Sequence, residues 1–227
     1  MSLILNIDTA ITNASISIAK DGNILGEAFN TEQKDQGAFI QPAIQSIAEN
    51  IGISLTDLSA IAVVAGPGSY TGLRVGMASA KGLCYALGKP LITIGTLGLL
   101  AYQAINQADI SQNDIPTLFC PMVDARRMEV FTAVYDKHLN TILSPSALII
   151  DESSFANLLL NNKIIFFGDG AAKWEQLNHF KNAHFFKPKN KTLYMNELSF
   201  KKFSNLEFAD LAYTEPIYIK EFYSAKI

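Results

Sequence analysis

The chain has 227 residues, of which 49% are hydrophobic and only 17% charged, and its formal net charge at pH 7 is −3. This balance excludes a disordered chain, which would be poor in apolar residues and rich in charge. The negative net charge also argues against a protein that grips a nucleic-acid backbone by itself, because neutralising phosphates requires clustered lysines and arginines.

Three strands, a helix and a fourth strand are predicted before the first glycine-rich loop. Apolar runs and alternating patterns place the strands at residues 3–7, 14–19, 24–29 and 60–65. Isoleucines at helical spacing predict a helix over residues 36–50. The first strand ends at Asp8, and the fourth is wholly apolar, which is typical of a strand covered on both faces of its sheet.

The loop that follows runs from Gly66 to Tyr70 and leads into a predicted helix over residues 71–87, with a short strand at 91–94. Free N–H groups at a helix start attract anions, so this loop could cradle a phosphate. The candidate cofactor-binding residues are Asp8, Gly66, Gly68 and Ser69. The glycine spacing is one residue longer than the dinucleotide fingerprint, and a Walker A pattern is absent. A tight strand-to-helix turn without any ligand fits the sequence equally well.

The helix over residues 71–87 is apolar nearly all round, which is typical of a helix covered on more than one side. A second subunit could supply the additional cover, and the neighbouring helix over 36–50 is the intramolecular alternative. The first possibility predicts a partner interface made of large apolar and small residues from both helices: Phe39, Ala43, Ile47, Gly72, Gly76 and Leu83.

The second half repeats this order of elements. Strands are predicted at residues 117–123, 129–135, 142–150 and 163–167, and helices at about 151–159, with Asp151 as N-cap, and 171–177. Its first strand also ends at an aspartate, Asp124. Such a duplication predicts an α/β fold of the actin-like (ASKHA, ribonuclease H-like) two-lobe class. We expect lobes at residues 1–97 and 98–205, with the tail 206–227 forming a last strand or helix that packs back on the first lobe.

The residue types needed for catalysis are not in place. The three histidines lie in the second half without metal-ligand spacing, so we predict no metal site. Ala10 stands where phosphate-binding actin-like folds place glycine after the first aspartate, and Ser69 has no evident base. Asp124 and Arg126 could form an ion pair in the lobe cleft or a weak pair on a loop. Cys84 and Cys120 are predicted to be buried, reduced thiols. We therefore predict no catalytic residue and no cofactor.

The run from Gly66 to Arg74, continuing through Gly76 and residues 80–83, resembles the hallmark of the TsaB (YeaZ) family. Shorter matches are found at residues 5–10, 124–127 and 168–171. Two segments depart from the family. Residues 34–37 read Lys-Asp-Gln-Gly where a His-Ser-Glu run is usual, and the Pro216–Lys220 segment ends in lysine rather than arginine.

This resemblance implies a non-catalytic scaffold in bacterial tRNA threonylcarbamoyladenosine synthesis, active through heterodimerisation with the catalytic paralogue TsaD and with the ATPase TsaE. The modified base would be the adenosine adjacent to the anticodon in tRNAs that read codons beginning with A. Such a subunit would meet tRNA only through the complex and could form a homodimer when alone. Without a signal-peptide pattern or a membrane-spanning run, we expect it in the cytoplasm. The alternatives are an active nucleotide-dependent kinase or ATPase, a metallopeptidase, or a nucleic-acid-binding module.

Overall fold

The computed structural model describes residues 1–11, 13–30, 36–108 and 115–220. The chain divides into two compact units. Unit 1 comprises Met1–Leu99 and Asn190–Pro216, and unit 2 comprises Leu100–Lys189 and Ile217–Ile227. Unit 1 is therefore built from two separate stretches of sequence.

Unit 1 contains a five-stranded mixed sheet in the order β3-β2-β1-β4-β5. The strands are β1 (Leu3–Asp8), β2 (Ala14–Lys20), β3 (Asn23–Asn30), β4 (Ala60–Gly66) and β5 (Leu91–Gly95). The first three pair antiparallel, whereas β1–β4 and β4–β5 pair parallel. Strand β4 is buried along its whole length, as its apolar sequence predicted.

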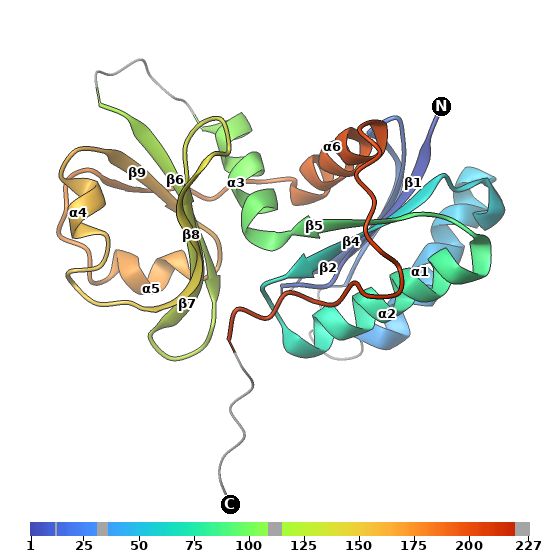
Figure 1. Cartoon of the computed structure of the whole chain (residues 1–227), viewed down its shortest axis with the longest axis horizontal. Coiled ribbons are helices and arrows are strands. Elements are labelled where there is room, and N and C mark those ends of the chain that lie inside the picture. Colours follow the sequence, from blue (N-terminus) through green and yellow to red (C-terminus); the bar gives the residue numbers. More distant parts are fainter. Residues whose placement is uncertain (12, 31–35, 109–114, 221–227) are drawn as a thin grey trace, which may run out of the picture. The chain divides into compact units, whose positions relative to one another are not determined.

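Helices cover both faces of this sheet (Figure 1). Helices α1 (Gln36–Ile51) and α2 (Tyr70–Leu87) pack on one face and α6 (Lys191–Ser204) on the other. Alternate residues of β1 and β4 therefore enter two separate cores: Leu5 and Val63 pack beneath α1 and α2, while Ile4 and Val64 pack beneath α6. Helix α2 begins after Ser69, whose hydroxyl accepts from the N–H of Gly72, and it ends at Gly88 in the left-handed conformation.

Helix α6 buries polar residues against the sheet. Asn196 lies at its centre with no exposed surface, and its Oδ1 accepts from Asn6 Nδ2 (2.7 Å) and Ser17 Oγ (3.1 Å). Its own amide donates to the carbonyl of Thr192 at 2.7 Å. Because an unpaired polar group in this position would be costly, the network fixes the helix in one register on the sheet.

Unit 2 repeats the topology, with a sheet in the order β10-β9-β6-β7-β8. Its strands are β6 (Thr117–Asp124), β7 (Glu129–Tyr135), β8 (Thr141–Ile149), β9 (Lys163–Phe167) and β10 (Ala183–Phe185). Strand β6 pairs antiparallel with β7 and parallel with β9, as β1 does with β2 and β4. Helices α4 (Ala156–Leu159) and α5 (Ala171–Glu175) pack on this sheet, and α3 (Thr96–Gln107) leads into the unit.

The core of unit 2 is aromatic. Trp174 has no exposed surface, and its ring centroid lies 4.5 Å from that of Phe166 and 5.4 Å from that of Phe155. Its indole N–H donates to the carbonyl of Asp151 at 3.2 Å. The short α5 is thus held in place by the side chain at its centre.

Several details differ from the sequence prediction. Helices α3 and α6 and strand β10 were not predicted, and the contacts of α6 place it in unit 1 rather than in the second lobe at 98–205. Asp151 is not a helix N-cap. Its Oδ1 accepts from Ser153 and Ser154 in a turn, and α4 begins only at Ala156. The described part of the tail, 206–220, forms turns and one bridge between Ala209 and Leu91 instead of a strand or helix.

Candidate functional site

Asp8 lies at the carboxyl end of β1 and is almost fully buried. Its Oδ1 accepts from the backbone N–H of Ala10 at 3.1 Å. Its Oδ2 has no hydrogen-bond donor of good geometry among the described residues, but the Lys191 ammonium lies 2.5 Å away. A buried carboxylate needs a counter-charge, and the first turn of α6 supplies it.

The glycine-rich loop before α2 closes over the residues that follow Asp8. Thr9 Oγ1 donates to the carbonyl of Gly72 at 2.7 Å, and the N–H of Ser69 donates to the carbonyl of Ala10 at 2.7 Å. A Cβ atom at Gly68 would lie 2.1 Å from the Ala10 carbonyl oxygen, and one at Gly72 would lie 2.1 Å from that of Thr9. These glycines are therefore required for close packing of the chain on itself. Gly66 serves differently, since it adopts φ 116°, a region that only glycine enters readily.

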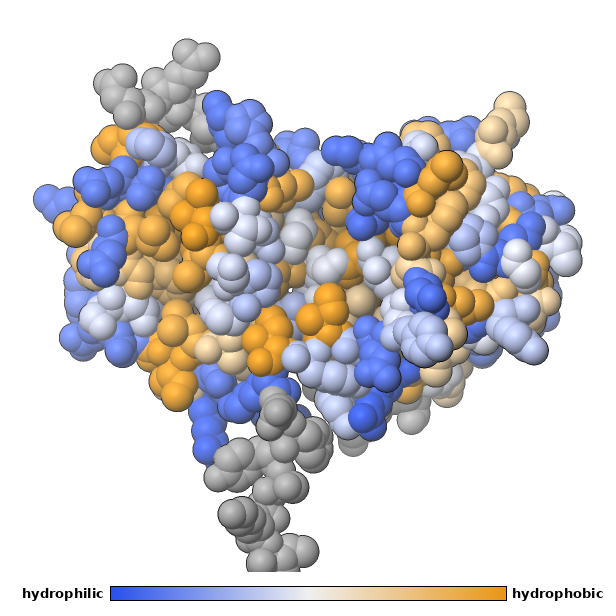
Figure 2. Space-filling model, in the orientation of Figure 1, coloured by the Kyte–Doolittle hydropathy of each residue, from blue (hydrophilic) through white to orange (hydrophobic). Residues whose placement is uncertain are grey.

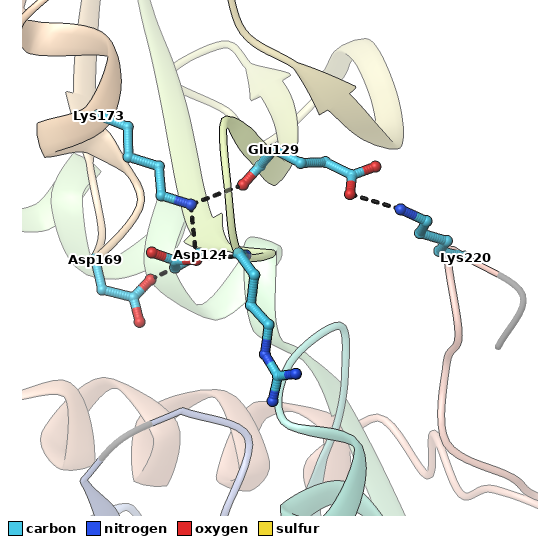
Figure 3. Close-up of polar contacts among 6 residues, drawn as sticks. Asp124, Glu129, Asp169, Lys173 and Lys220 are labelled. Atoms are coloured by element: carbon cyan, nitrogen blue, oxygen red, sulfur yellow. Dashed lines mark hydrogen bonds and ion pairs between the residues drawn. The ribbon is translucent and has the colours of Figure 1, made fainter. Parts of the chain in front are cut away.

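The equivalent position of unit 2 is Asp124, at the end of β6 (Figure 3). Its Oδ1 accepts from the N–H of Arg126 at 2.6 Å and from the Lys173 ammonium at 2.8 Å. Its own N–H donates to Asp169 Oδ1 at 2.9 Å. Partial burial alone would raise the pKa of the Asp124 carboxyl, but the bonds from Lys173 and Arg126 outweigh it and hold that pKa below its usual value of 3.8. An ion pair between Asp124 and Arg126 was predicted, but the ion-pair partner of Asp124 is Lys173.

The two units thus share one arrangement at the end of the first strand. In each, an aspartate accepts from the N–H two residues later and pairs with a lysine from a later helix. In each, a glycine loop packs against the strand end: a Cβ at Gly168 would lie 2.2 Å from the carbonyl oxygen of Met122. The duplication extends from topology to individual contacts.

The turn between β6 and β7 has an unusual backbone. Arg126 and Arg127 follow one another with φ of 69° and 48°, and both are exposed. A left-handed conformation costs a residue with a side chain roughly 1–2 kcal/mol, and hairpins normally place glycine, asparagine or aspartate there. Two backbone hydrogen bonds close the turn. The N–H of Glu129 donates to the carbonyl of Arg126 (3.1 Å), and the N–H of Ala125 donates to the carbonyl of Glu129 (3.1 Å). The sequence indicates that this segment matches the family, but it does not reveal the left-handed conformation of the two arginines.

Most of the predicted interface residues are not on the surface. Ala43, Ile47, Gly72 and Gly76 are buried within unit 1, and a Cβ at Gly76 would lie 2.2 Å from Thr9 Oγ1. They therefore offer a partner almost no surface. Their burial arises because α1 and α2 pack on the sheet through these positions.

Phe39 and Leu83 are half-buried against the same core and remain partly accessible. The outward face of α1 and α2 is mixed. Its small or apolar residues and one tyrosine are Ala38, Pro42, Ala78, Gly82, Tyr85 and Ala86, and its polar residues are Gln41, Gln45, Ser46, Glu49, Asn50, Thr71 and Arg74. Tyr85 is 85% exposed. In Figure 2 apolar residues are interspersed with polar ones over both units, and scattered exposed apolar residues of this kind do not by themselves mark an interface.

Comparison with known proteins adds the family. The family model of TsaD, described as tRNA N6-adenosine threonylcarbamoyltransferase, matches residues 30–215. A relative from Buchnera aphidicola, named tRNA threonylcarbamoyladenosine biosynthesis protein TsaB, is 31% identical over 79% of this chain and 84% of its own length. The chain belongs to the TsaB family.

Other TsaB relatives match over a shorter span. The protein of that name from Escherichia coli is 34% identical over 61% of this chain, and that from Bacillus subtilis is 32% identical over 58%. The chain spans little more than half the length of these two relatives, 57% and 54%.

Solved structures support the fold. YeaZ from Pseudomonas aeruginosa superposes with a TM-score of 0.77 at 18% identity, covering 96% of this chain and 100% of that one. The activator of 2-hydroxyisocaproyl-CoA dehydratase from Clostridium difficile, solved with ADPNP, reaches a TM-score of 0.50 at 8% identity over 92% and 98% of the two chains. The predicted actin-like class is confirmed.

Within the described ranges, no three histidine, cysteine, aspartate or glutamate side chains are gathered so that they could hold a metal ion. No helix in the same ranges is both long and apolar enough to cross a bilayer. Cys84 and Cys120 are buried free thiols, and burial raises their pKa values to about 11 and about 12.

Proposed function

We propose that this TsaB-family chain is a non-catalytic subunit in the synthesis of threonylcarbamoyladenosine in tRNA, acting by heterodimerisation with a TsaD-type catalytic paralogue and with a TsaE-type ATPase. Family membership and the names of its relatives support the pathway. The modified base is the adenosine beside the anticodon, and the chain works in the cytoplasm. Alone, it forms a homodimer through the surface that otherwise receives the paralogue.

One observation supports the non-catalytic assignment: residues of unit 1 itself occupy the position at the end of β1 where a ligand would bind. A phosphate site in this fold would need the first aspartate and the glycine loop to be available to the ligand. Here Lys191 neutralises Asp8, and the backbone of Thr9 and Ala10 fills the space beside Gly68 and Gly72. A phosphate would have to displace both contacts, and the ion pair is nearly buried.

The docking surface that we propose is the outward face of α1 and α2, in place of the buried positions predicted from sequence. Its small residues allow a partner helix to approach closely, and Tyr85 offers a large amphipathic contact. An interface of ordinary size would bury on the order of 1,600 Å² in total. That area is compatible with two adjacent helices contributing together.

The Gly82→Glu variant tests this surface. A Cβ at Gly82 meets nothing within 4 Å, so the variant should fold, yet it places a charge in the centre of the contact. Burying that unpaired charge would cost several kcal/mol, so we expect loss of both self-association and binding to the paralogue. Light scattering measures self-association, and a pull-down measures binding to the paralogue. Modification of tRNA is assayed alongside. Lys137→Glu, on an exposed turn of unit 2, is the control. A folded Gly82→Glu chain that associates like wild type would place the interface elsewhere.

The alternative of an active kinase, ATPase or metallopeptidase gives a different outcome. It requires turnover by the isolated chain that the isosteric Asp8→Asn variant lacks. We expect neither ATP nor peptide turnover from either protein, and modification of tRNA only when the paralogue and the ATPase are added.

A further inference from the structure

The tip of the β6–β7 turn carries two exposed arginines side by side, Arg126 and Arg127. The charge of Arg126 helps to lower the pKa of the Asp124 carboxyl. Two of the acidic groups beside it pair with lysines: Asp124 pairs with Lys173, and Glu129 Oε2 lies 2.6 Å from the Lys220 ammonium (Figure 3). A third, Asp169, accepts the backbone N–H of Asp124. Neither Arg126 nor Arg127 forms an ion pair within 4.0 Å of a described carboxylate. Both arginines are exposed, so their guanidinium groups are accessible to another molecule.

The backbone strengthens this point. Both arginines hold left-handed conformations in which glycine would be free of strain, and they stand side by side. Residues held in unfavourable backbone conformations concentrate at functional sites, where the function of the side chain offsets the cost of the conformation. A turn that served only to join two strands would be more stable with Asn-Gly.

We propose that Arg126 and Arg127 bind the phosphodiester backbone of the tRNA that the assembled complex modifies. This inference rests on the proposed function. A guanidinium presents a planar fork of donors that matches phosphate geometry and stays charged at every physiological pH. Small anionic ligands are normally held in concave sites, whereas this tip is exposed, which favours an extended polyanion over a free nucleotide.

The proposal agrees with the net charge of −3. Two contacts cannot hold a tRNA alone, because backbone binding depends on many neutralised phosphates. The tip therefore adds to the affinity of a complex whose other contacts come from the partner subunits. Exposed Met128, next in the turn, extends the same surface with an apolar side chain.

The test is the double variant R126G/R127G, assayed as the complex with the paralogue. Glycine accepts both left-handed conformations, so the turn keeps its shape and loses only the two side chains. We expect tRNA affinity at physiological salt to fall roughly tenfold or more, and the slope of log K against log salt to flatten by about 1.4 to 1.8, as two lost phosphate contacts require. R126K/R127K, which keeps the charge without the fork, should lose affinity but retain most of the slope.

The matched control is K137A/K181A, which removes two exposed positive charges from elsewhere in unit 2. An R126G/R127G complex with the wild-type affinity and salt slope would overturn the proposal. So would loss of paralogue binding in a pull-down with tRNA affinity unaffected, which would assign the tip to an acidic protein surface. Weakened binding of ATP to the isolated chain, with tRNA affinity unaffected, would assign it to a nucleotide phosphate. If the wild-type chain neither binds the paralogue nor supports modification, the proposed function itself fails, and the inference with it.

Discussion

At the scale of single residues, the ion pair between Asp8 and Lys191 should contribute strongly to stability, because the Asp8 carboxylate is almost fully buried. Replacing Lys191 with methionine leaves a buried carboxylate without its counter-charge, and breaking a buried pair in this way costs about 3–5 kcal/mol. The double variant D8N/K191M removes the charge as well and should recover much of the loss. Urea unfolding followed by far-UV circular dichroism measures both. Lys201→Met, an exposed lysine on the same helix, is the control, and an equal effect of the two single changes would contradict the role of the pair.

Asp124 makes the stability of unit 2 depend on pH. The pKa of its carboxyl is depressed in the folded state despite partial burial, because Lys173 and the N–H of Arg126 stabilise the charged form. The stabilisation is therefore complete above the unfolded value and is lost as pH falls through the folded pKa. Between about pH 5 and about pH 2, wild type should lose more stability than Asp124→Asn. Trp174 is the single tryptophan and lies buried in this unit, so its fluorescence reports the transition.

An acid-induced loss of the same size in both proteins would show that Asp124 contributes nothing to it. Some loss will remain in the variant, because hydrogen bonds also lower the pKa values of Asp136 and Asp151 in the same unit. The strand-end aspartates were noticed from the sequence, but their lysine partners were not. Lys173 and Lys191 lie far along the chain, and only the folded sheet brings them to the strand ends.

At the scale of elements, helix α2 contains two glycines with opposite roles. Gly76→Ala would place a Cβ 2.2 Å from Thr9 Oγ1 and 3.6 Å from Val63, which forces the helix away from the sheet. Gly82→Ala meets open space and should stabilise the helix by about 0.5–1 kcal/mol, the usual gain from alanine in a helix interior. We expect opposite shifts of the thermal midpoint, measured by circular dichroism. An unchanged thermal midpoint for Gly76→Ala would mean that the contact with Thr9 can relax at no cost.

Helices were predicted where their buried faces are apolar and missed where they are not. The isoleucines of α1 revealed its periodicity, but α6 buries Thr192, Met195, Asn196 and Ser199 at helical spacing, so its inner face looks polar in the sequence. The hydrogen bonds that make such a face tolerable come from Asn6 and Ser17, distant in sequence. Helix α3 was not predicted for another reason. It starts at Thr96, directly after β5 ends at Gly95, and no loop signal separates the two elements.

At the scale of the whole molecule, the duplication was predictable because both halves show the same order of strands and both first strands end in aspartate. The division was less predictable. The first boundary was expected at residue 97 and lies after Leu99, but residues 190–205 were expected in the second lobe and belong to unit 1. Sequence patterns describe neighbours along the chain, and they carry no signal that a chain returns to an earlier unit.

That return has a consequence for the order of synthesis. A ribosome delivers β1 to β5 first, then all of the strands of unit 2, and only afterwards α6, which covers one face of the first sheet. Domains generally fold as they emerge, so the strands of unit 2, contiguous from Thr117 to Phe185, can close before unit 1 is complete. Until Lys191 and the rest of α6 leave the exit tunnel, the apolar face formed by Ile4, Ala62 and Val64 has no cover. The N-terminal half of this protein is thus the last to be finished, and one face of its sheet stays open to non-native contacts until then.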